Sequence, residues 1–233
     1  MPSQTYLARR GQLETYFDRS AAAAWIRMTS DAPLNFIRGT VRAGRDRMRN
    51  TLLDWLPADL RGRRVLDAGC GTGAFALEAA KRGAHVLAID LSPTLVQLAR
   101  ERTPHLPRAG EITFTVGDML DPSLGRFDYV VAMDSLIHYS TKDVAAALAQ
   151  LALRVERSML ITFAPRTPVL ASMHLCGRLF PRGNRAPSIE PVSERWLLRS
   201  IDAEPALACW APGRTRRITS GFYISQALEV MRT

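Results

Sequence analysis

The chain has 233 residues, of which 47% are apolar and 23% charged, values typical of a soluble globular protein with one domain, or one domain and an appendage. No apolar run approaches the roughly 20 residues that span a bilayer, and the N-terminal stretch lacks the apolar core of a secretory signal. Three scattered cysteines indicate a reducing compartment, so we expect a cytoplasmic protein. The cysteines and histidines show no zinc-like spacing, so we expect no protein-bound metal.

The chain is strongly basic, with a net charge of +9 and 29 arginines among its 31 cationic residues. Arginine clusters at residues 42–49, 61–64 and 214–217 favour anionic partners, such as nucleic acid, an acidic membrane face or a polycarboxylate substrate. No recognised nucleic-acid-binding module accompanies the charge, so we expect no nucleic-acid partner.

Residues 1–61 precede the first predicted strand and are expected to form an N-terminal helical arm. The pattern predicts one helix over residues 4–28 and an amphipathic helix over residues 34–56, whose middle is weakened by Gly44. The arm is too short to have a core of its own. We therefore expect it to pack as a lid across the ligand site of a domain formed by residues 62–233; a plain structural appendage is the alternative.

The stretch Val65–Gly73 contains two apolar residues, an acid and three glycines at alternate positions, and a helical pattern follows over residues 74–81. This order of strand, glycine-rich turn and helix opens a βαβ unit. Glycine allows positive φ and lets a ligand approach the backbone without an intervening Cβ atom. The start of the helix adds unpaired N–H groups and a positive dipole end.

The spacing D-x-G-x-G-x-G differs from the G-x-G-x-x-G of dinucleotide sites, where a pyrophosphate lies on the helix N-terminus. It resembles the S-adenosyl-L-methionine (AdoMet) site of class I methyltransferases. AdoMet carries an ammonium and a sulfonium group, so acids near the turn are electrostatically favourable. A glycine-rich turn of another α/β protein is the alternative. The resemblance assigns five residues of this stretch to the cofactor: Asp67, Gly69, Cys70, Gly71 and Gly73.

A second apolar run, Ala84–Asp90, also ends in an acid after one helix length. A carboxylate at the end of the second strand can accept both hydroxyl hydrogens of a ribose, so Asp90 is predicted to bind the ribose of AdoMet. Leu91 is expected to lie against the adenine. Ser92 and Pro93 are an N-cap and a first-turn proline for the next helix.

The remaining pattern alternates strands and helices. Strands are predicted over residues 112–116, 127–133 and 158–163, helices over 93–102, 141–155, within 168–180 and over 193–201, and a closing pair of strands over 206–210 and 219–228. This order predicts a Rossmann-like α/β fold of the class I methyltransferase type. We expect a seven-stranded, mostly parallel sheet with one antiparallel strand and helices on both faces.

Ligands of such sheets bind at the carboxyl ends of the strands. Four predicted strands end in or are followed by an aspartate that we expect to bind the cofactor: Asp67, Asp90, Asp118 and Asp134. In class I methyltransferases an acid at the position of Asp118 faces the adenine amino group, so the resemblance assigns Asp118 and the next residue, Met119, to the cofactor. His138 is the one histidine that also follows a strand end. We expect it to be catalytic, and a hydrogen-bonded histidine without catalytic duty is the alternative.

Several segments resemble those of magnesium-protoporphyrin IX O-methyltransferases of chlorophyll and bacteriochlorophyll synthesis. They are Glu14–Phe17, Leu136–Tyr139, Thr162–Thr167 and Gly221–Ser225, together with the glycine-rich stretch, and the likeness runs from about Thr15 to Met231. The family implicates a tyrosine of the arm and the histidine after the fourth strand in activity, and the matching positions are Tyr16 and His138. After Phe17 the arm departs from the plant and cyanobacterial pattern.

The resemblance implies that a methyl group moves from AdoMet to one propionate carboxylate of Mg-protoporphyrin IX, with the magnesium arriving inside the substrate. By analogy with Glu, whose pKa is about 4.3, the propionate is ionised at pH 7, so His138 is expected to orient it, with general-base action as a secondary role. Tyr139 and Arg166 are assigned to the substrate, because a guanidinium pairs well with a carboxylate. A solvated Arg166 is the alternative.

The resemblance also implies handover from the large subunit of magnesium chelatase and peripheral contact with photosynthetic membranes. A protein that binds AdoMet without catalysis is one alternative, although every cofactor position is intact, and two other enzymatic functions stay open. One is a different small-molecule O- or N-methyltransferase, for example of a quinone pathway. The other is a nucleic-acid methyltransferase, which the sequence Asp134–Ile137 disfavours because it lacks the Asp/Asn-Pro-Pro-Tyr/Phe of base N-methylating enzymes.

Overall fold

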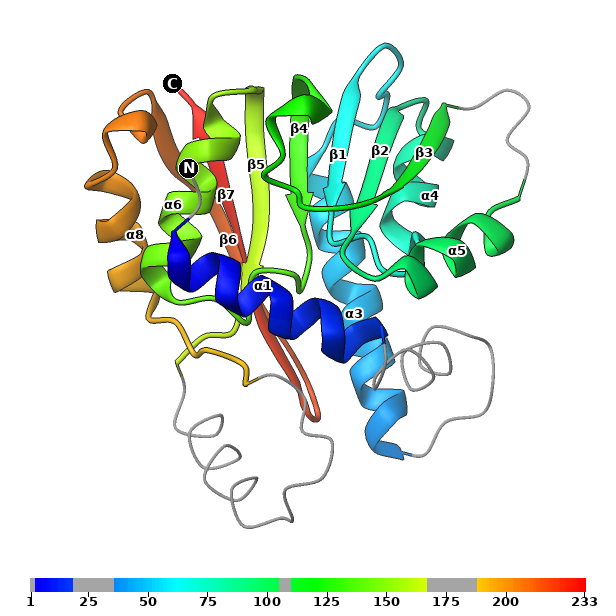
Figure 1. The fold of residues 1–233 in the computed structure, drawn as a ribbon, viewed down its shortest axis with the longest axis horizontal. Coiled ribbons are helices and arrows are strands. Elements are labelled where there is room, and N and C mark those ends of the chain that lie inside the picture. Colours follow the sequence, from blue (N-terminus) through cyan, green and yellow to red (C-terminus); the bar gives the residue numbers. More distant parts are fainter. Residues whose placement is uncertain (1–2, 19–35, 105–109, 167–187) are drawn as a thin grey trace.

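One mixed β-sheet forms the centre of the computed structural model, which describes residues 3–18, 36–104, 110–166 and 188–233 (Figure 1). The strands are β1 (Arg64–Ala68), β2 (His85–Asp90), β3 (Glu111–Val116), β4 (Phe127–Ala132), β5 (Val155–Phe163), β6 (Trp210–Ser220) and β7 (Tyr223–Arg232). Their order is β3-β2-β1-β4-β5-β7-β6. Strands β1 to β5 pair in parallel, whereas β7 is antiparallel to both β5 and β6. The predicted seven-stranded sheet with one antiparallel strand is therefore confirmed.

Helices cover both faces of this sheet, as expected. The described helices are α1 (Gln4–Tyr16), α3 (Phe36–Trp55), α4 (Ala74–Lys81), α5 (Pro93–Arg102), α6 (Thr141–Ala152) and α8 (Glu194–Asp202), with short 3₁₀ turns η2 (Pro122–Leu124) and η3 (Pro205–Leu207). Because side chains alternate along a strand, neighbours such as Val65 and Leu66 of β1 face opposite sides. Val65 joins an apolar cluster with α3, α4 and α5, and Leu66 joins one with α1, α6 and α8.

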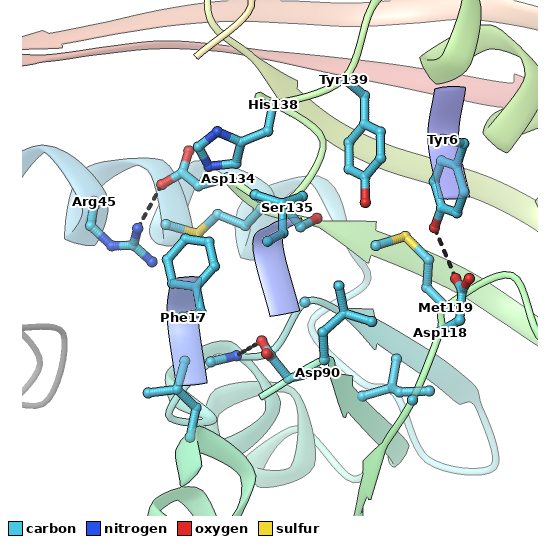
Figure 2. Close-up of a pocket in the computed structure, with 18 residues that line it drawn as sticks. Tyr6, Phe17, Arg45, Asp90, Asp118, Met119, Asp134, Ser135, His138 and Tyr139 are labelled. Atoms are coloured by element: carbon cyan, nitrogen blue, oxygen red, sulfur yellow. Dashed lines mark hydrogen bonds and ion pairs between the residues drawn. The ribbon is translucent and has the colours of Figure 1, made fainter. Parts of the chain in front are cut away.

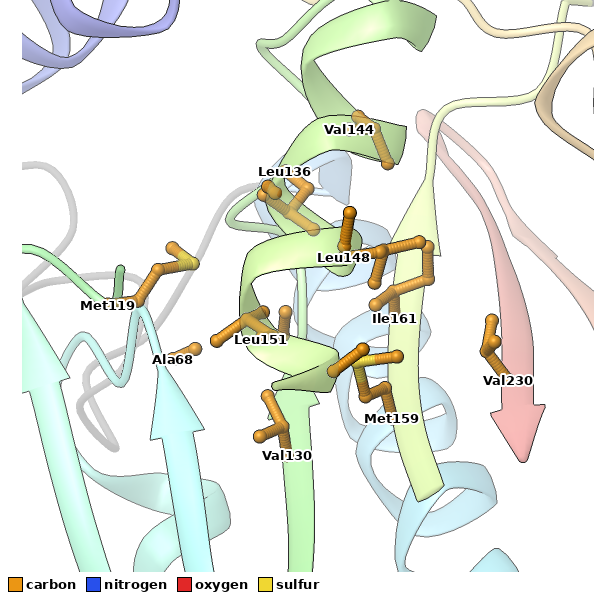
Figure 3. Packing of buried hydrophobic residues seen from close by; sticks show 14 of the residues in the cluster. Ala68, Met119, Val130, Leu136, Val144, Leu148, Leu151, Met159, Ile161 and Val230 are labelled. Atoms are coloured by element: carbon orange, nitrogen blue, oxygen red, sulfur yellow. The ribbon is translucent and has the colours of Figure 1, made fainter. Parts of the chain in front are cut away.

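The second of these clusters is built mainly on α6. Figure 3 shows Leu148 of this helix beside Ile161 of β5, and Leu151 above Val130 of β4. These side chains are fully buried, and each such burial stabilises the fold by roughly 1.5–3 kcal/mol. The packing holds the loop between β4 and α6 in place, because both elements that flank the loop are anchored in the core.

The helices begin at the glycine and capping residues that the sequence predicts. Gly73 precedes α4 with φ 78°, a left-handed conformation that glycine adopts without strain. Ser92 caps α5, where its Oγ atom accepts a hydrogen bond from the N–H of Leu95 at 3.3 Å, and Pro93 occupies the first turn. Ser140 caps α6 in the same way.

The two described arm helices take different places. Helix α1 runs across the edge of the sheet where β1, β4 and β5 end, whereas α3 packs on β6, β7 and α4 (Figure 1). A Cβ atom on Gly44 of α3 would lie 2.5 Å from the Cδ1 atom of Tyr223, so the glycine that weakens this helix also permits its close approach to β7. The helix predicted over residues 34–56 is confirmed. The one predicted over residues 4–28 is observed to Tyr16, and residues 19–28 lie outside the described ranges.

The predicted positions of the last two strands were wrong. Residues 205–207 form a 3₁₀ turn that begins at Pro205, and β6 begins only at Trp210. Gly221, with φ 55°, makes the hairpin turn inside the predicted final strand. Strand β6 is the edge of the sheet and is largely exposed, so its arginine-rich sequence lacks the apolar alternation by which strands are identified. The helix expected within residues 168–180 lies outside the described ranges. None of the described helices is both long and apolar enough to cross a membrane.

Candidate functional site

A cavity lies between helix α1 and the carboxyl ends of the first four strands (Figure 2). Its lining comes from the loops after β1, β2, β3 and β4 and from the arm. The lining residues are Gly69 and Gly71 after β1, Ile89 to Leu91 and Leu95 around the end of β2, Gly117 to Met119 after β3, Met133 to Ser135, His138 and Tyr139 after β4, and Tyr6, Leu13, Phe17 and Arg45 from the arm.

Most residues that the sequence assigned to the site line this cavity, and five do not. Those that line it are Gly69, Gly71, Asp90, Leu91, Asp118, Met119, Asp134, His138 and Tyr139. Asp67 is buried at the end of β1, Cys70 is partly buried in the glycine-rich turn, and Gly73 begins α4. Tyr16 packs edge-on against Phe17 at 5.3 Å between ring centroids. Arg166 is exposed, and its backbone N–H donates to the carbonyl of Val192 at 2.9 Å.

The glycine-rich turn has the backbone conformation that its sequence predicts. Gly69, Gly71 and Gly73 have φ values of 84°, 54° and 78°, all in the left-handed region. A Cβ atom on Gly69 would lie 2.4 Å from the Cβ atom of Ser135, so the turn packs directly on the loop after β4. Asp90 secures the turn, because its carboxylate accepts hydrogen bonds from the N–H groups of Gly71 at 2.8 Å and Ser92 at 2.9 Å.

Two acids beneath this turn stand in an environment that disfavours negative charge. Burial and the nearby charge of Asp90, partly opposed by a hydrogen bond from the amide of Ala76, together raise the pKa of Asp67 to about 7. Burial also raises the pKa of Asp90. The Oδ2 atom of Asp67 has no hydrogen-bond partner. A cation bound at this turn would relieve the repulsion between the two acids.

Burial also raises the pKa of the Cys70 thiol well above its usual range, with the charges of Asp67 and Asp90 adding to the effect. Cys70 is therefore a neutral thiol and not a nucleophile. Across the described ranges, no group of three or more His, Cys, Asp or Glu side chains could hold a metal ion.

Asp118 connects the end of β3 to the arm. Its carboxylate accepts hydrogen bonds from the hydroxyl of Tyr6 at 2.8 Å and from the backbone N–H of Leu120 at 2.9 Å, and it pairs with Arg10 at 3.0 Å. The ring of Tyr6 stacks on Tyr139 at 4.7 Å between centroids. Burial raises the pKa of Tyr6, and the neighbouring Tyr139 and Asp118 add to the effect, so its hydroxyl remains a donor. Helix α1 is thus held over the cavity by a buried tyrosine.

His138 lies in the loop between β4 and α6 and is 6% exposed. Its Nδ1 atom is 3.3 Å from the carbonyl oxygen of Ser188, and because a carbonyl only accepts, Nδ1 is the donor. The imidazole meets the ring of Phe17 edge-to-face at 6.0 Å between centroids. Tyr16, Phe17 and His138 therefore form a chain of ring contacts in which Phe17 is the member from the arm that reaches the cavity.

Comparison with known sequences places this geometry in a family. The chain is 46% identical to the magnesium-protoporphyrin O-methyltransferase of Rhodobacter capsulatus, over 98% of this chain and 99% of that protein. The chain belongs to the magnesium-protoporphyrin O-methyltransferase family. It is 30% identical to the magnesium-protoporphyrin O-methyltransferase of Synechocystis sp., over 94% of each chain. The family described as magnesium-protoporphyrin IX methyltransferase C-terminus matches residues 132–232, and a general methyltransferase domain matches residues 65–157.

A solved member of the family has the same fold. The crystal structure of magnesium protoporphyrin IX methyltransferase from Synechocystis PCC 6803 with bound SAH superposes with a TM-score of 0.84 at 28% identity. The match covers 96% of this chain and 100% of that chain, so it includes both the sheet and the described arm helices. The class I methyltransferase fold expected from the sequence is confirmed.

The sequence did not predict some of the residues that line the cavity. Four of them come from the arm: Tyr6, Leu13, Phe17 and Arg45. Phe17 lies inside a segment that resembles the family, and Ser135 lies beside another, so those signals could have found them. Tyr6 and Arg45 carry no motif, and only the docking of α1 and α3 brings them to the cavity.

Proposed function

We propose that the protein transfers a methyl group from AdoMet to a propionate carboxylate of Mg-protoporphyrin IX, giving the monomethyl ester in bacteriochlorophyll biosynthesis. The similarity of nearly the whole chain to magnesium-protoporphyrin O-methyltransferases carries this proposal. The chain is 33% identical to the ubiquinone biosynthesis O-methyltransferase of Xanthomonas oryzae, over 56% of this chain. Coverage therefore favours the porphyrin over a quinone precursor as the acceptor.

The glycine-rich turn and the acids around it suit AdoMet, which when bound supplies an electrophilic methyl group on a sulfonium. The open turn at Gly69 and Gly71 would admit the methionine part against bare backbone. Asp90 retains acceptor capacity for a ribose hydroxyl, since its carboxylate oxygens can together accept about four hydrogen bonds and three backbone N–H groups donate to them here. Asp67 would compensate the positive charge from below, and Leu91 and Met119 would flank the adenine.

The acceptor carboxylate asks for positioning more than for a base. A propionate resembles a Glu side chain, with a pKa of about 4.3, and is already ionised at pH 7. The protein must remove water from one oxygen and hold it in line with the methyl–sulfur bond, which can lower the barrier by roughly 7–11 kcal/mol. His138 is suited to this task, because it is buried, lines the cavity and is oriented through Nδ1.

The arm, residues 1–61, is proposed to act as the lid of the domain formed by residues 62–233. Tyr6 and Leu13 of α1, with Phe17 directly after it, line the cavity on the side away from the sheet, which supports exclusion of water by this helix. Tyr16 would act through Phe17, on which it packs. Arg166 would reach a propionate only from outside the cavity lining, and its exposure leaves it available for the second propionate.

Comparison of methyl transfer to three acceptors tests the function: Mg-protoporphyrin IX, its dimethyl ester and a catechol that mimics a quinone precursor. The dimethyl ester is the matched control, because it keeps the metal and the macrocycle and lacks a free carboxylate. We expect AdoMet-dependent product from the free acid alone. Transfer to the catechol without transfer to the free acid would instead support the quinone-pathway alternative.

The proposed place of the protein in the cell is the cytoplasm, in peripheral contact with photosynthetic membranes. The net charge of +9 favours contact with an anionic surface, and the family resemblance suggests handover from the large subunit of magnesium chelatase beside photosynthetic membranes. Sedimentation with vesicles of neutral or of anionic lipid tests the membrane contact. Binding to anionic vesicles that salt abolishes is expected, and equal recovery with both lipids would contradict it.

A further inference from the structure

Asp134 has an unusual backbone conformation and an unusually large number of partners. Among the described residues it is the one non-glycine residue with positive φ, at 55°. Its backbone N–H donates to the Oγ1 atom of Thr162 at 2.7 Å. Its carboxylate accepts from Tyr223 at 3.0 and 3.1 Å, from Ser225 at 3.2 Å and from Thr162 at 3.2 Å, and it pairs with Arg45 at 3.0 Å. A strained residue of this kind persists where its surroundings hold it firmly.

These partners come from segments that are far apart in the sequence and that resemble the family. Thr162 begins the segment Thr162–Thr167, and Tyr223 and Ser225 belong to Gly221–Ser225. Strands β5 and β7 carry them side by side, because the two strands pair with each other. Asp134 itself directly precedes the loop that holds Ser135 and His138. The AdoMet contacts proposed above do not involve these two segments, whereas both of them meet at the carboxylate of Asp134.

Helix α3 reaches the same carboxylate from the arm. Tyr223 occupies the space where a side chain on Gly44 would stand, with its Cβ atom 2.8 Å from that position. The next residue, Arg45, then pairs with Asp134 and also lines the cavity. Burial raises the pKa of Tyr223, and the charge of Asp134 adds to this effect, so the phenol stays protonated and donates.

We propose that the Asp134 side chain is a positioning group and not a ligand of AdoMet. Three hydroxyl groups converge on its Oδ1 atom and Arg45 pairs with its Oδ2 atom, and the side chain is only 5% exposed, so protein groups and not a cofactor engage this carboxylate. Through these contacts Asp134 fixes the start of the β4 loop, and with it His138, relative to α3 and to the cavity. Tyr223 is its principal partner, because it contacts both carboxylate oxygens. This inference rests on the proposed function, in which His138 orients the acceptor.

The test compares Tyr223→Phe, Asp134→Asn and the double variant with the wild type. Tyr129→Phe is the matched control, since Tyr129 is a buried tyrosine of β4 outside this group of contacts. We expect the Tyr223 and Asp134 variants to bind AdoMet within about twofold of wild type by calorimetry and to lose about tenfold in single-turnover methyl transfer. The double variant should be no slower than Asp134→Asn, because both changes act through one carboxylate. The control should match the wild type in both measurements.

Amide hydrogen exchange of residues 134–140 supplies a readout that needs no methyl acceptor, so it separates this inference from the proposed function. Faster exchange in Tyr223→Phe and in Ser225→Ala, but not in Tyr129→Phe, is expected. Ser225→Ala also serves if Asp134→Asn does not fold. A cofactor role for Asp134 would appear as AdoMet binding that is tenfold weaker or more in Asp134→Asn and normal in Tyr223→Phe, and it would overturn the inference. Unchanged exchange in both partner variants, or additive losses of rate, would overturn it as well.

Discussion

The buried acid Asp67 yields the most quantitative prediction. Its pKa is raised from an ordinary value of about 3.9 to about 7, so the folded, ligand-free protein holds this proton between about pH 4 and pH 7 while the unfolded chain does not. Retention of this proton adds to the free energy of unfolding. This contribution is fully present below pH 4 and is lost as the pH rises through 7. Three pKa units at 1.36 kcal/mol each make the loss about 4 kcal/mol.

Loss of the same proton should strengthen AdoMet binding, because a cationic cofactor binds more tightly beside the ionised acid. With a pKa of about 7, Asp67 is about 10% ionised at pH 6 and about 90% at pH 8, so AdoMet should bind about tenfold more tightly at pH 8. Calorimetry at pH 6 and 8 in two buffers of different ionisation enthalpy would measure both the affinity and the proton released. The amino group of AdoMet also titrates, near pH 8, so a protein variant is needed to separate the two.

Asp67→Asn is that variant, because an amide stays neutral at every pH. At pH 8 the ligand-free variant should resist urea better than the wild type, yet bind AdoMet at least tenfold more weakly. Its remaining pH dependence should be that of the amino group of the ligand alone. A variant that is less stable than wild type at pH 8, or that keeps the wild-type dependence of affinity between pH 6 and 7, would refute the reasoning.

Three further predictions concern the turn, the catalytic histidine and the arm. Gly69→Ala should lower the free energy of unfolding by about 1–2 kcal/mol from its φ of 84° alone, and by more from the contact with Ser135, and should bind AdoMet poorly by calorimetry. The control Gly11→Ala, with open space around it in α1, should be slightly stabilising in urea unfolding, and equal effects of the two variants would contradict this prediction. His138→Ala should bind AdoMet normally and lose most single-turnover activity, whereas His138→Asn should retain part of it, because an amide can still donate; an Asn variant as inactive as Ala, with a wild-type acid limb near pH 6.5, would make the histidine a base. Tyr6→Phe removes the hydroxyl that donates to Asp118 and should weaken docking of α1 by about 1.5–3 kcal/mol, seen as faster hydrogen exchange over residues 3–17, and unchanged exchange would argue against Tyr6 as the residue that holds the arm.

The part of the site that could be predicted from the sequence is the part encoded by short-range patterns. The turn at Gly69 needs glycine for its φ, and Ser92 caps a helix through an atom three residues away, so spacing alone identifies both. The acids at strand ends follow from the geometry of a parallel sheet. These features are local or periodic, and a single sequence displays them.

Features that depend on docking of distant elements could not be predicted in this way. Arg45 and Tyr6 reach the cavity because α3 and α1 pack on the sheet, and no short motif marks them. Tyr16 was chosen over its neighbour Phe17, but one residue along a helix turns the side chain by about 100°, and Phe17 is the one that lines the cavity. The predicted limits of β6 were wrong because an exposed edge strand needs no alternation of apolar residues.

The position of the transferred methyl group tests the central claim most directly. The protein is incubated with methyl-labelled AdoMet and Mg-protoporphyrin IX, and the product is treated with mild alkali, which cleaves a carboxylate methyl ester and leaves aryl ethers and N-methyl groups intact. Carboxyl methylation by this family member predicts one label per porphyrin, all of it released as methanol. A label that resists alkali, or no transfer to the porphyrin by folded protein that binds AdoMet, would contradict the proposed reaction.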